Sequence, residues 1–157
     1  MKKYGKSTKR GFTLVELIVV IVILAVLAAM LVPALIGYID RARKEKDYQT
    51  ASTVYTAAQA AITEQYGRGK ITTKAATTIT YGAYKDDAGK DIILDLAGVD
   101  SGKVTNYTFT TDPNLIIKTG SVTINNGGTT ATYNLAADGT WSASDVSYSG
   151  ANNVTGN

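Results

Sequence analysis

An uncharged apolar segment near the N-terminus constrains the fold of this 157-residue chain more than any other feature. No charged residue occurs from Leu17 to Ile39, and the sequence is almost purely apolar from Phe12 to Leu35. A helix that crosses a membrane needs about 20 such residues, whereas strands rarely exceed about ten. The length of the segment therefore predicts a helix that cannot join the core of a soluble domain, and it leaves the rest of the chain to form a small folded body.

The same helix is expected to continue beyond the apolar segment. Residues 40–66 contain no helix breaker, and Gly67 supplies a stop. Their small and apolar residues recur with the spacing of an amphipathic stripe, at Ala51, Val54, Tyr55, Ala58, Ala61 and Ile62. We therefore predict one helix from Phe12 to Tyr66, roughly 80 Å long at about 1.5 Å per residue. Pro33 and Gly37 are expected to bend it.

The second half of the chain is rich in Thr, Gly, Asn, Tyr and Val, which favours strands and turns. We predict a loop over residues 67–103 that holds one short strand near Ile79–Tyr84, and the type of the apolar run Ile92–Leu96 stays open. Antiparallel strands are predicted over about residues 104–148, at Val104–Thr110, Leu115–Lys118, Ser121–Ile124, Thr129–Leu135 and Thr140–Tyr148. The predicted fold class is α+β, a long N-terminal helix packed on a C-terminal antiparallel sheet.

Charge and composition exclude several classes of function. Five of the sixteen basic residues lie in the first ten positions without any acid, and the remainder of the chain carries a net charge of −2. A basic face on the folded part, typical of nucleic-acid binding, is therefore not indicated. The chain has no Cys and no His, which excludes zinc sites and catalytic triads built on these residues. We expect no enzymatic activity, no cofactor and no metal.

One acidic cluster could contradict the expected absence of a metal. It consists of Asp86, Asp87, Asp91 and Asp95, which could together bind calcium. Their spacing does not follow the EF-hand loop, and a solvated loop is the preferred interpretation.

The segment KRGFTLVELIVVIVILAVLAAMLVPAL, residues 9–35, resembles the N-terminus of type IV prepilins and of the related pseudopilins of type II secretion and competence systems. It combines a short basic leader, a Gly11–Phe12 junction, Glu16 at the fifth position after that junction, a long apolar helix and Pro33. The resemblance implies the pilin fold. It divides the chain into a cleaved leader (1–11), a transmembrane or filament-core helix (12–39) and a globular body (40–157).

The resemblance also implies a sequence of events. A membrane peptidase would cut after Gly11 and methylate the new amine of Phe12. The basic leader keeps that end in the cytoplasm, so the body lies outside the cytoplasmic membrane. An assembly ATPase and a membrane platform protein would then move the subunit into an extracellular helical filament of identical copies. In the family, the acid at the position of Glu16 pairs with the N-terminal amine of a neighbouring copy, which Phe12 would provide here.

Other interpretations of these residues remain open. Thr13 and Glu16 also form a capping-box pattern, which closes a helix start without any partner and is compatible with the intersubunit role. The apolar helix could be a plain anchor or a secretory signal cut near Ala28 or Ala29, but neither accounts for the sequence around the Gly11–Phe12 junction. We predict a structural subunit of a type IV pilus that serves adhesion, twitching motility or DNA uptake. The alternatives are a pseudopilin and a surface adhesin on a fixed membrane anchor.

Overall fold

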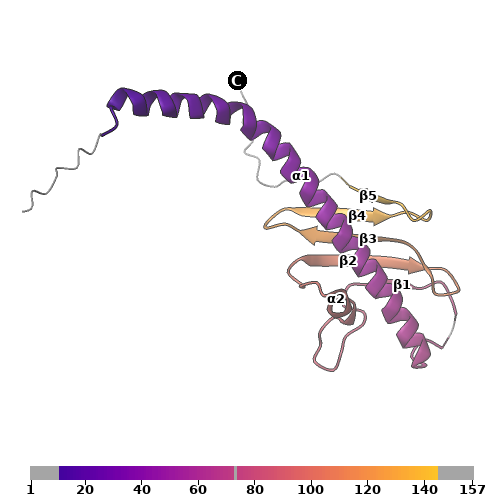
Figure 1. Cartoon of the computed structure of the whole chain (residues 1–157). Helices are drawn as coiled ribbons and strands as arrows, with labels where there is room; N and C mark the ends of the chain where they lie inside the picture. Colours follow the sequence, from indigo (N-terminus) through magenta and orange to yellow (C-terminus); the bar gives the residue numbers. More distant parts are fainter. Residues whose placement is uncertain (1–10, 73, 145–157) are drawn as a thin grey trace, which may run out of the picture. The chain divides into compact units, whose positions relative to one another are not determined.

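The computed structural model describes residues 11–72 and 74–144, which form a long helix, a short helix and a five-stranded sheet (Figure 1). The elements are α1 (Leu14–Gly67), β1 (Thr78–Thr80), α2 (Ile92–Ala97), β2 (Val104–Thr111), β3 (Ile117–Asn125), β4 (Thr130–Leu135) and β5 (Trp141–Ala143). The chain divides into two compact units, Met1–Arg43 and Lys44–Asn157. The helix and the antiparallel sheet confirm the predicted α+β class.

The first unit contains the apolar part of α1. The helix starts at Leu14, two residues after the predicted start, because Thr13 acts as its cap. It runs on through Pro33 and Gly37 without interruption, and the bend expected there stays a prediction. Every residue from 11 to 39 is exposed in the isolated subunit. Within the described residues, α1 is the one helix long and apolar enough to cross a membrane.

The second unit is a meander, in which each strand pairs with the next in the order β1-β2-β3-β4-β5. All four pairings are antiparallel. The C-terminal part of α1 crosses one face of this sheet (Figure 1). The predicted helix stripe supplies that contact, because its members Ala51, Val54, Ala58, Ala61 and Ile62 are all buried. Tyr55 is only half-buried and lies edge-on to Phe109 and Trp141.

The first strand and the two strands predicted between Leu115 and Ile124 need correction, and the open segment Ile92–Leu96 can now be assigned. The first strand is Thr78–Thr80 and ends in a turn, so it is shorter than predicted and begins earlier. The open segment Ile92–Leu96 is helical, as part of α2. The two strands predicted at Leu115–Lys118 and Ser121–Ile124 are one strand, β3. The strand predicted over Thr140–Tyr148 is observed as β5, and positions 145–148 lie outside the described residues.

Gly120 explains why β3 continues where the sequence suggested a break. It pairs with Phe109 of β2. A Cβ atom at this position would lie 2.2 Å from Phe109 Cδ1 and 2.6 Å from the Thr108 carbonyl oxygen. The glycine is therefore a packing requirement inside a strand and not a turn signal, since the Phe109 ring occupies the space of its missing side chain.

Candidate functional site

The segment Gly11–Glu16 forms the start of α1, and hydrogen bonds between Thr13 and Glu16 fix it. The Thr13 backbone N–H and its hydroxyl both donate to Glu16 Oε2, each at 2.8 Å. In return the Glu16 backbone N–H donates to Thr13 Oγ1 at 3.2 Å. This reciprocal pattern is the capping box that the sequence predicted, and it satisfies N–H groups that have no partner within the helix.

The capping box leaves part of Glu16 available. Both bonds from Thr13 go to Oε2, and Oε1 has no hydrogen-bond partner in the part of the chain that the structure describes. An ionised carboxylate offers about four acceptor positions, so Glu16 can hold the helix start and accept another donor at the same time. The two roles considered for this residue are thus compatible in geometry.

The Gly11–Phe12 junction lies just before the helix and is accessible. Neither residue is helical, both are exposed, and the Phe12 side chain is 89% exposed. Apart from its neighbours in the chain, no atom of the described residues lies within 4 Å of the Cβ position at Gly11. A peptidase could therefore approach this peptide bond without unwinding the helix. Cutting it would convert the peptide nitrogen of Phe12 into a cationic amine four positions before Glu16.

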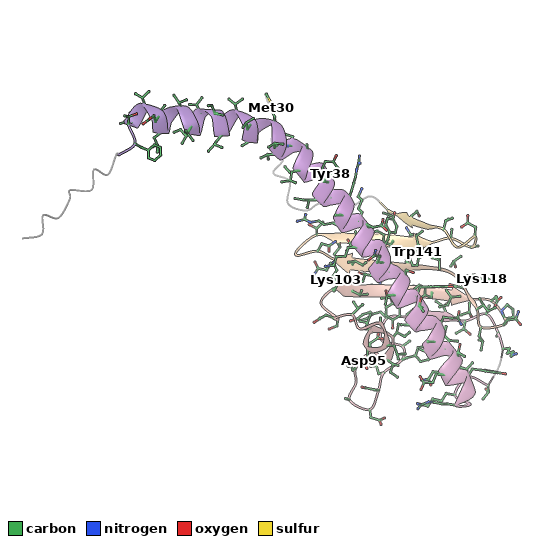
Figure 2. The ribbon with its side chains drawn as sticks, in the orientation of Figure 1. Met30, Tyr38, Asp95, Lys103, Lys118 and Trp141 are labelled. Atoms are coloured by element: carbon green, nitrogen blue, oxygen red, sulfur yellow. The ribbon has the colours of Figure 1, made fainter. Side chains whose placement is uncertain are left out.

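The apolar part of α1 presents a continuous surface that must be covered. Its large side chains point outward, from Leu14 at 73% exposed through Leu24 at 58% to Met30 at 73% (Figure 2). Monomeric soluble proteins rarely expose contiguous apolar patches larger than a few hundred Å². This surface therefore needs either lipid or other protein around it.

The carboxylates of the acidic cluster, residues 86–95, bind separate partners and do not converge on one point. Asp91 caps α2 by accepting bonds from Ile93 N and Leu94 N, and it also binds Gly82 N and the Tyr107 hydroxyl. Asp86 accepts two backbone bonds within its own turn, and Asp95 pairs with Lys90. Among the described residues, no group of three acids is placed to hold a metal ion. The preferred interpretation as a solvated loop was wrong for Asp91, which is a structural residue that joins α2, the turn after β1 and strand β2.

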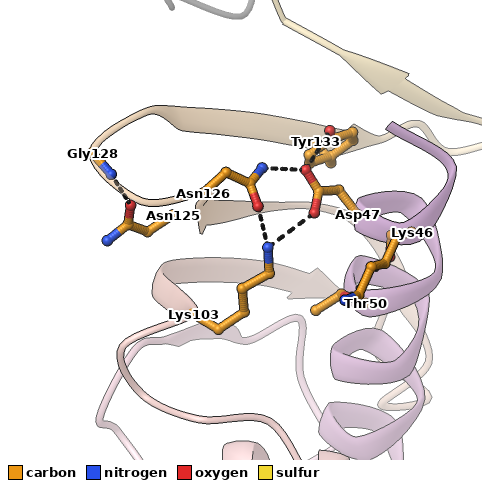
Figure 3. A network of polar contacts seen from close by, with 8 residues as sticks. All are labelled: Lys46, Asp47, Thr50, Lys103, Asn125, Asn126, Gly128 and Tyr133. Atoms are coloured by element: carbon orange, nitrogen blue, oxygen red, sulfur yellow. Dashed lines mark hydrogen bonds and ion pairs between the residues drawn. The ribbon is translucent and has the colours of Figure 1, made fainter. Parts of the chain in front are cut away.

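The burial of the charged residue Asp47 was not predicted. Asp47 is only 2% exposed, although it lies on α1 next to a run of exposed charges. Its carboxylate binds Lys103 Nζ at 3.2 Å, Asn126 Nδ2 at 2.5 Å and the Tyr133 hydroxyl at 3.2 Å (Figure 3). A signal was present in the sequence, since Asp47 precedes Ala51 by four positions and Val54 by seven and so belongs to the buried stripe.

Comparison with known families gives one match. Residues 6–32 match the prokaryotic N-terminal methylation motif, so the matched segment includes Gly11, Phe12 and Glu16. No solved structure matches the chain.

Proposed function

Because the matched motif is the type IV prepilin-type signal, we propose that this chain is the precursor of a type IV pilus subunit. The observation that carries the proposal is the uninterrupted exposure of residues 11–39, an apolar helix with one acid at its edge. The second unit has a core of its own. In such a subunit, the apolar surface of the helix would be covered first by lipid in the cytoplasmic membrane and then by other copies of the subunit in a filament.

The proposed maturation uses the geometry of the junction. A prepilin peptidase cuts after Gly11, which is exposed and has no side chain of its own. The same enzyme methylates the amine of Phe12. An assembly ATPase and a membrane platform protein then lift the subunit into an extracellular filament that adheres to surfaces and supports twitching motility.

Glu16 gives the filament a defined register in this proposal. The amine of Phe12 would lie four positions before Glu16 of its own chain, just outside the helix that starts at Leu14. Subunits enter a filament staggered along its axis, so an incoming Glu16 can meet the amine of a copy already in place. Among apolar helices an unpaired charge is costly and a paired one much less so. The pair therefore favours one axial position among the many that apolar packing alone would tolerate.

Glu16→Gln tests this function, because it keeps the size of the side chain and removes its charge. We expect a variant that is inserted and cut normally but forms few surface filaments, and Glu16→Ala should behave similarly. Thr13→Ala is the matched control, since it removes the capping hydroxyl and keeps the carboxylate. Filaments are counted by electron microscopy while the processed subunit in the membrane is measured by immunoblot. Normal filament numbers for Glu16→Gln would remove the charge pair from the proposal.

Mass spectrometry of sheared surface filaments separates the pilus from the alternatives. A pilus subunit should begin at Phe12 and carry one methyl group on its amine. An uncut chain that begins at Met1 and stays in the membrane would favour a fixed surface adhesin. A correctly cut and methylated subunit that forms no surface filament would favour a pseudopilin.

A further inference from the structure

A carboxylate, an ammonium group and a carboxamide meet at one end of the sheet in the second unit. Asp47 comes from α1, Lys103 directly precedes β2, and Asn126 directly follows β3 (Figure 3). Asp47 Oδ1 binds Lys103 Nζ, Asp47 Oδ2 binds Asn126 Nδ2, and Lys103 Nζ also contacts Asn126 Oδ1. Each of the three groups thus touches the other two, and the contacts close a ring.

The backbone holds these groups in place. Val104 pairs with Ile124, and the Asn125 N–H donates to the Lys103 carbonyl oxygen at 2.8 Å. Beyond Asn126 the turn is fixed as well, since Asn125 Oδ1 accepts the Gly128 N–H at 3.1 Å. Groups held in this way react as if at very high concentration, because little orientational freedom remains to be lost.

A simple ion pair does not account for the whole arrangement. The side chain of Asp47 is 3% exposed and that of Lys103 is 29% exposed, so their opposite charges compensate each other in a largely buried environment. The two charges would compensate each other without Asn126. Its amide oxygen nevertheless contacts the lysine, and its amide nitrogen contacts the carboxylate. The Tyr133 hydroxyl donates to the same carboxylate oxygen that binds the amide nitrogen, which fixes that oxygen further.

We infer that Lys103 and Asn126 form an intramolecular isopeptide bond, and that Asp47 transfers the protons for this reaction. The inference concerns the folded body and does not depend on the proposed pilus function. The nucleophile is an amine, the electrophile is the side-chain amide carbon, and the acid–base group lies within hydrogen-bond reach of both nitrogens.

The reaction balances without any further reactant. Asp47 takes a proton from the Lys103 ammonium, and the lone pair of the neutral amine attacks Cγ of Asn126 to form a new N–C bond. Asp47 then gives its proton to Nδ2, so that the Cγ–Nδ2 bond breaks and ammonia leaves. The carboxylate finally takes the excess proton from the new amide nitrogen and passes it to the ammonia. The net change converts an ammonium and a carboxamide into a secondary amide and an ammonium ion.

The bond would join the first residue before β2 to the first residue after β3. These two strands are connected at their other ends, through residues 112–116, so the cross-link closes the open end of their hairpin. The chain has no cysteine, and an amide is a covalent staple that needs none and does not respond to reductants. A closed loop restricts the unfolded chain in the way a disulfide does.

The mass of the full-length chain, purified in detergent, tests the inference. We expect it to be lower than the sequence mass by one molecule of ammonia. Trypsin cuts after unmodified lysine, so the bond should prevent cleavage after Lys103. It should leave residues 91–118 joined to residues 119–157. The sequence mass together with normal cleavage after Lys103, in folded protein, would overturn the inference.

Three variants assign the chemistry. Lys103→Arg keeps the charge beside Asp47 and should restore the sequence mass, whereas the matched control Lys118→Arg should still lose ammonia. Asp47→Asn should also restore the sequence mass while circular dichroism shows a folded body. Asn126 precedes a glycine, and a cyclic imide formed by these two residues would lose ammonia as well. Loss of ammonia that persists in Lys103→Arg would identify that imide and refute the isopeptide bond.

Discussion

Replacing Asp91 with alanine should destabilise the folded body strongly, because one carboxylate joins a helix, a strand and a turn. Its Oδ1 accepts the N–H groups of Ile93 at 2.9 Å and Leu94 at 3.2 Å. Its Oδ2 accepts the Gly82 N–H at 2.9 Å and the Tyr107 hydroxyl at 2.7 Å. Tyr107 is fully buried. Its burial, and to a lesser extent its hydrogen bond to Asp91, raises the pKa of the phenol, so the hydroxyl keeps its proton and remains a donor.

The size of the effect follows from these contacts. Loss of a helix cap costs about 1 kcal/mol. Leaving a buried hydroxyl without its partner costs about 1–3 kcal/mol. With the orphaned Gly82 N–H included, Asp91→Ala should cost about 3–5 kcal/mol, a large part of the roughly 5–15 kcal/mol that stabilises a typical domain.

Two further variants divide this energy. Asp91→Asn keeps an acceptor for the cap but turns an N–H₂ group toward the Gly82 N–H, so it should lose roughly half as much as Asp91→Ala. Tyr107→Phe removes a single bond and should lose about 1 kcal/mol.

Urea unfolding of residues 44–157, followed by the fluorescence of Trp141, measures the series. We expect this fragment to be soluble and folded, because the described core lies within it. If Asp91→Ala proved no more costly than Tyr107→Phe, the cap and the Gly82 bond would contribute nothing, and the assignment of Asp91 as the joining residue would be wrong.

Three shorter predictions concern other parts of the chain. Gly120→Ala should cost about 1–3 kcal/mol in urea unfolding, because its methyl group would meet the Phe109 ring. Ile62→Asp places a charge in the core and should lower the melting temperature by many degrees, whereas the exposed neighbour Thr63→Asp should change it little. Gly11→Val should block processing, so that an immunoblot of membranes shows only the full-length chain; processed subunit in this variant would place the cut elsewhere.

The helix and the site at its start were predictable from the sequence because local rules determine them. The length of the apolar segment excludes a strand, and the stripe from Ala51 to Ile62 identifies the face that the sheet covers. Thr13 and Glu16 are close in the chain, so their capping box depends on helix geometry alone.

The missed features depend on residues far apart in the chain. Asp91 and Gly98 do mark the two ends of α2, as its N-cap and its left-handed C-cap, but a six-residue helix gives no clear period. Strand β3 was predicted as two strands with Gly120 between them. The Phe109 ring, which requires a glycine at this position, belongs to another strand. Asp47 was not singled out from the sequence, because its partners Lys103 and Asn126 come much later in the chain.

The two outer strands of the sheet are only three residues long in the described structure, Thr78–Thr80 at one edge and Trp141–Ala143 at the other. A free strand edge is a template for pairing with another chain, and the danger rises with local concentration. In the filament that we propose, the folded body would meet copies of itself at very high density. Short edge strands offer few backbone groups for pairing with another copy. Closely packed bodies are therefore less prone to join their sheets into a continuous one.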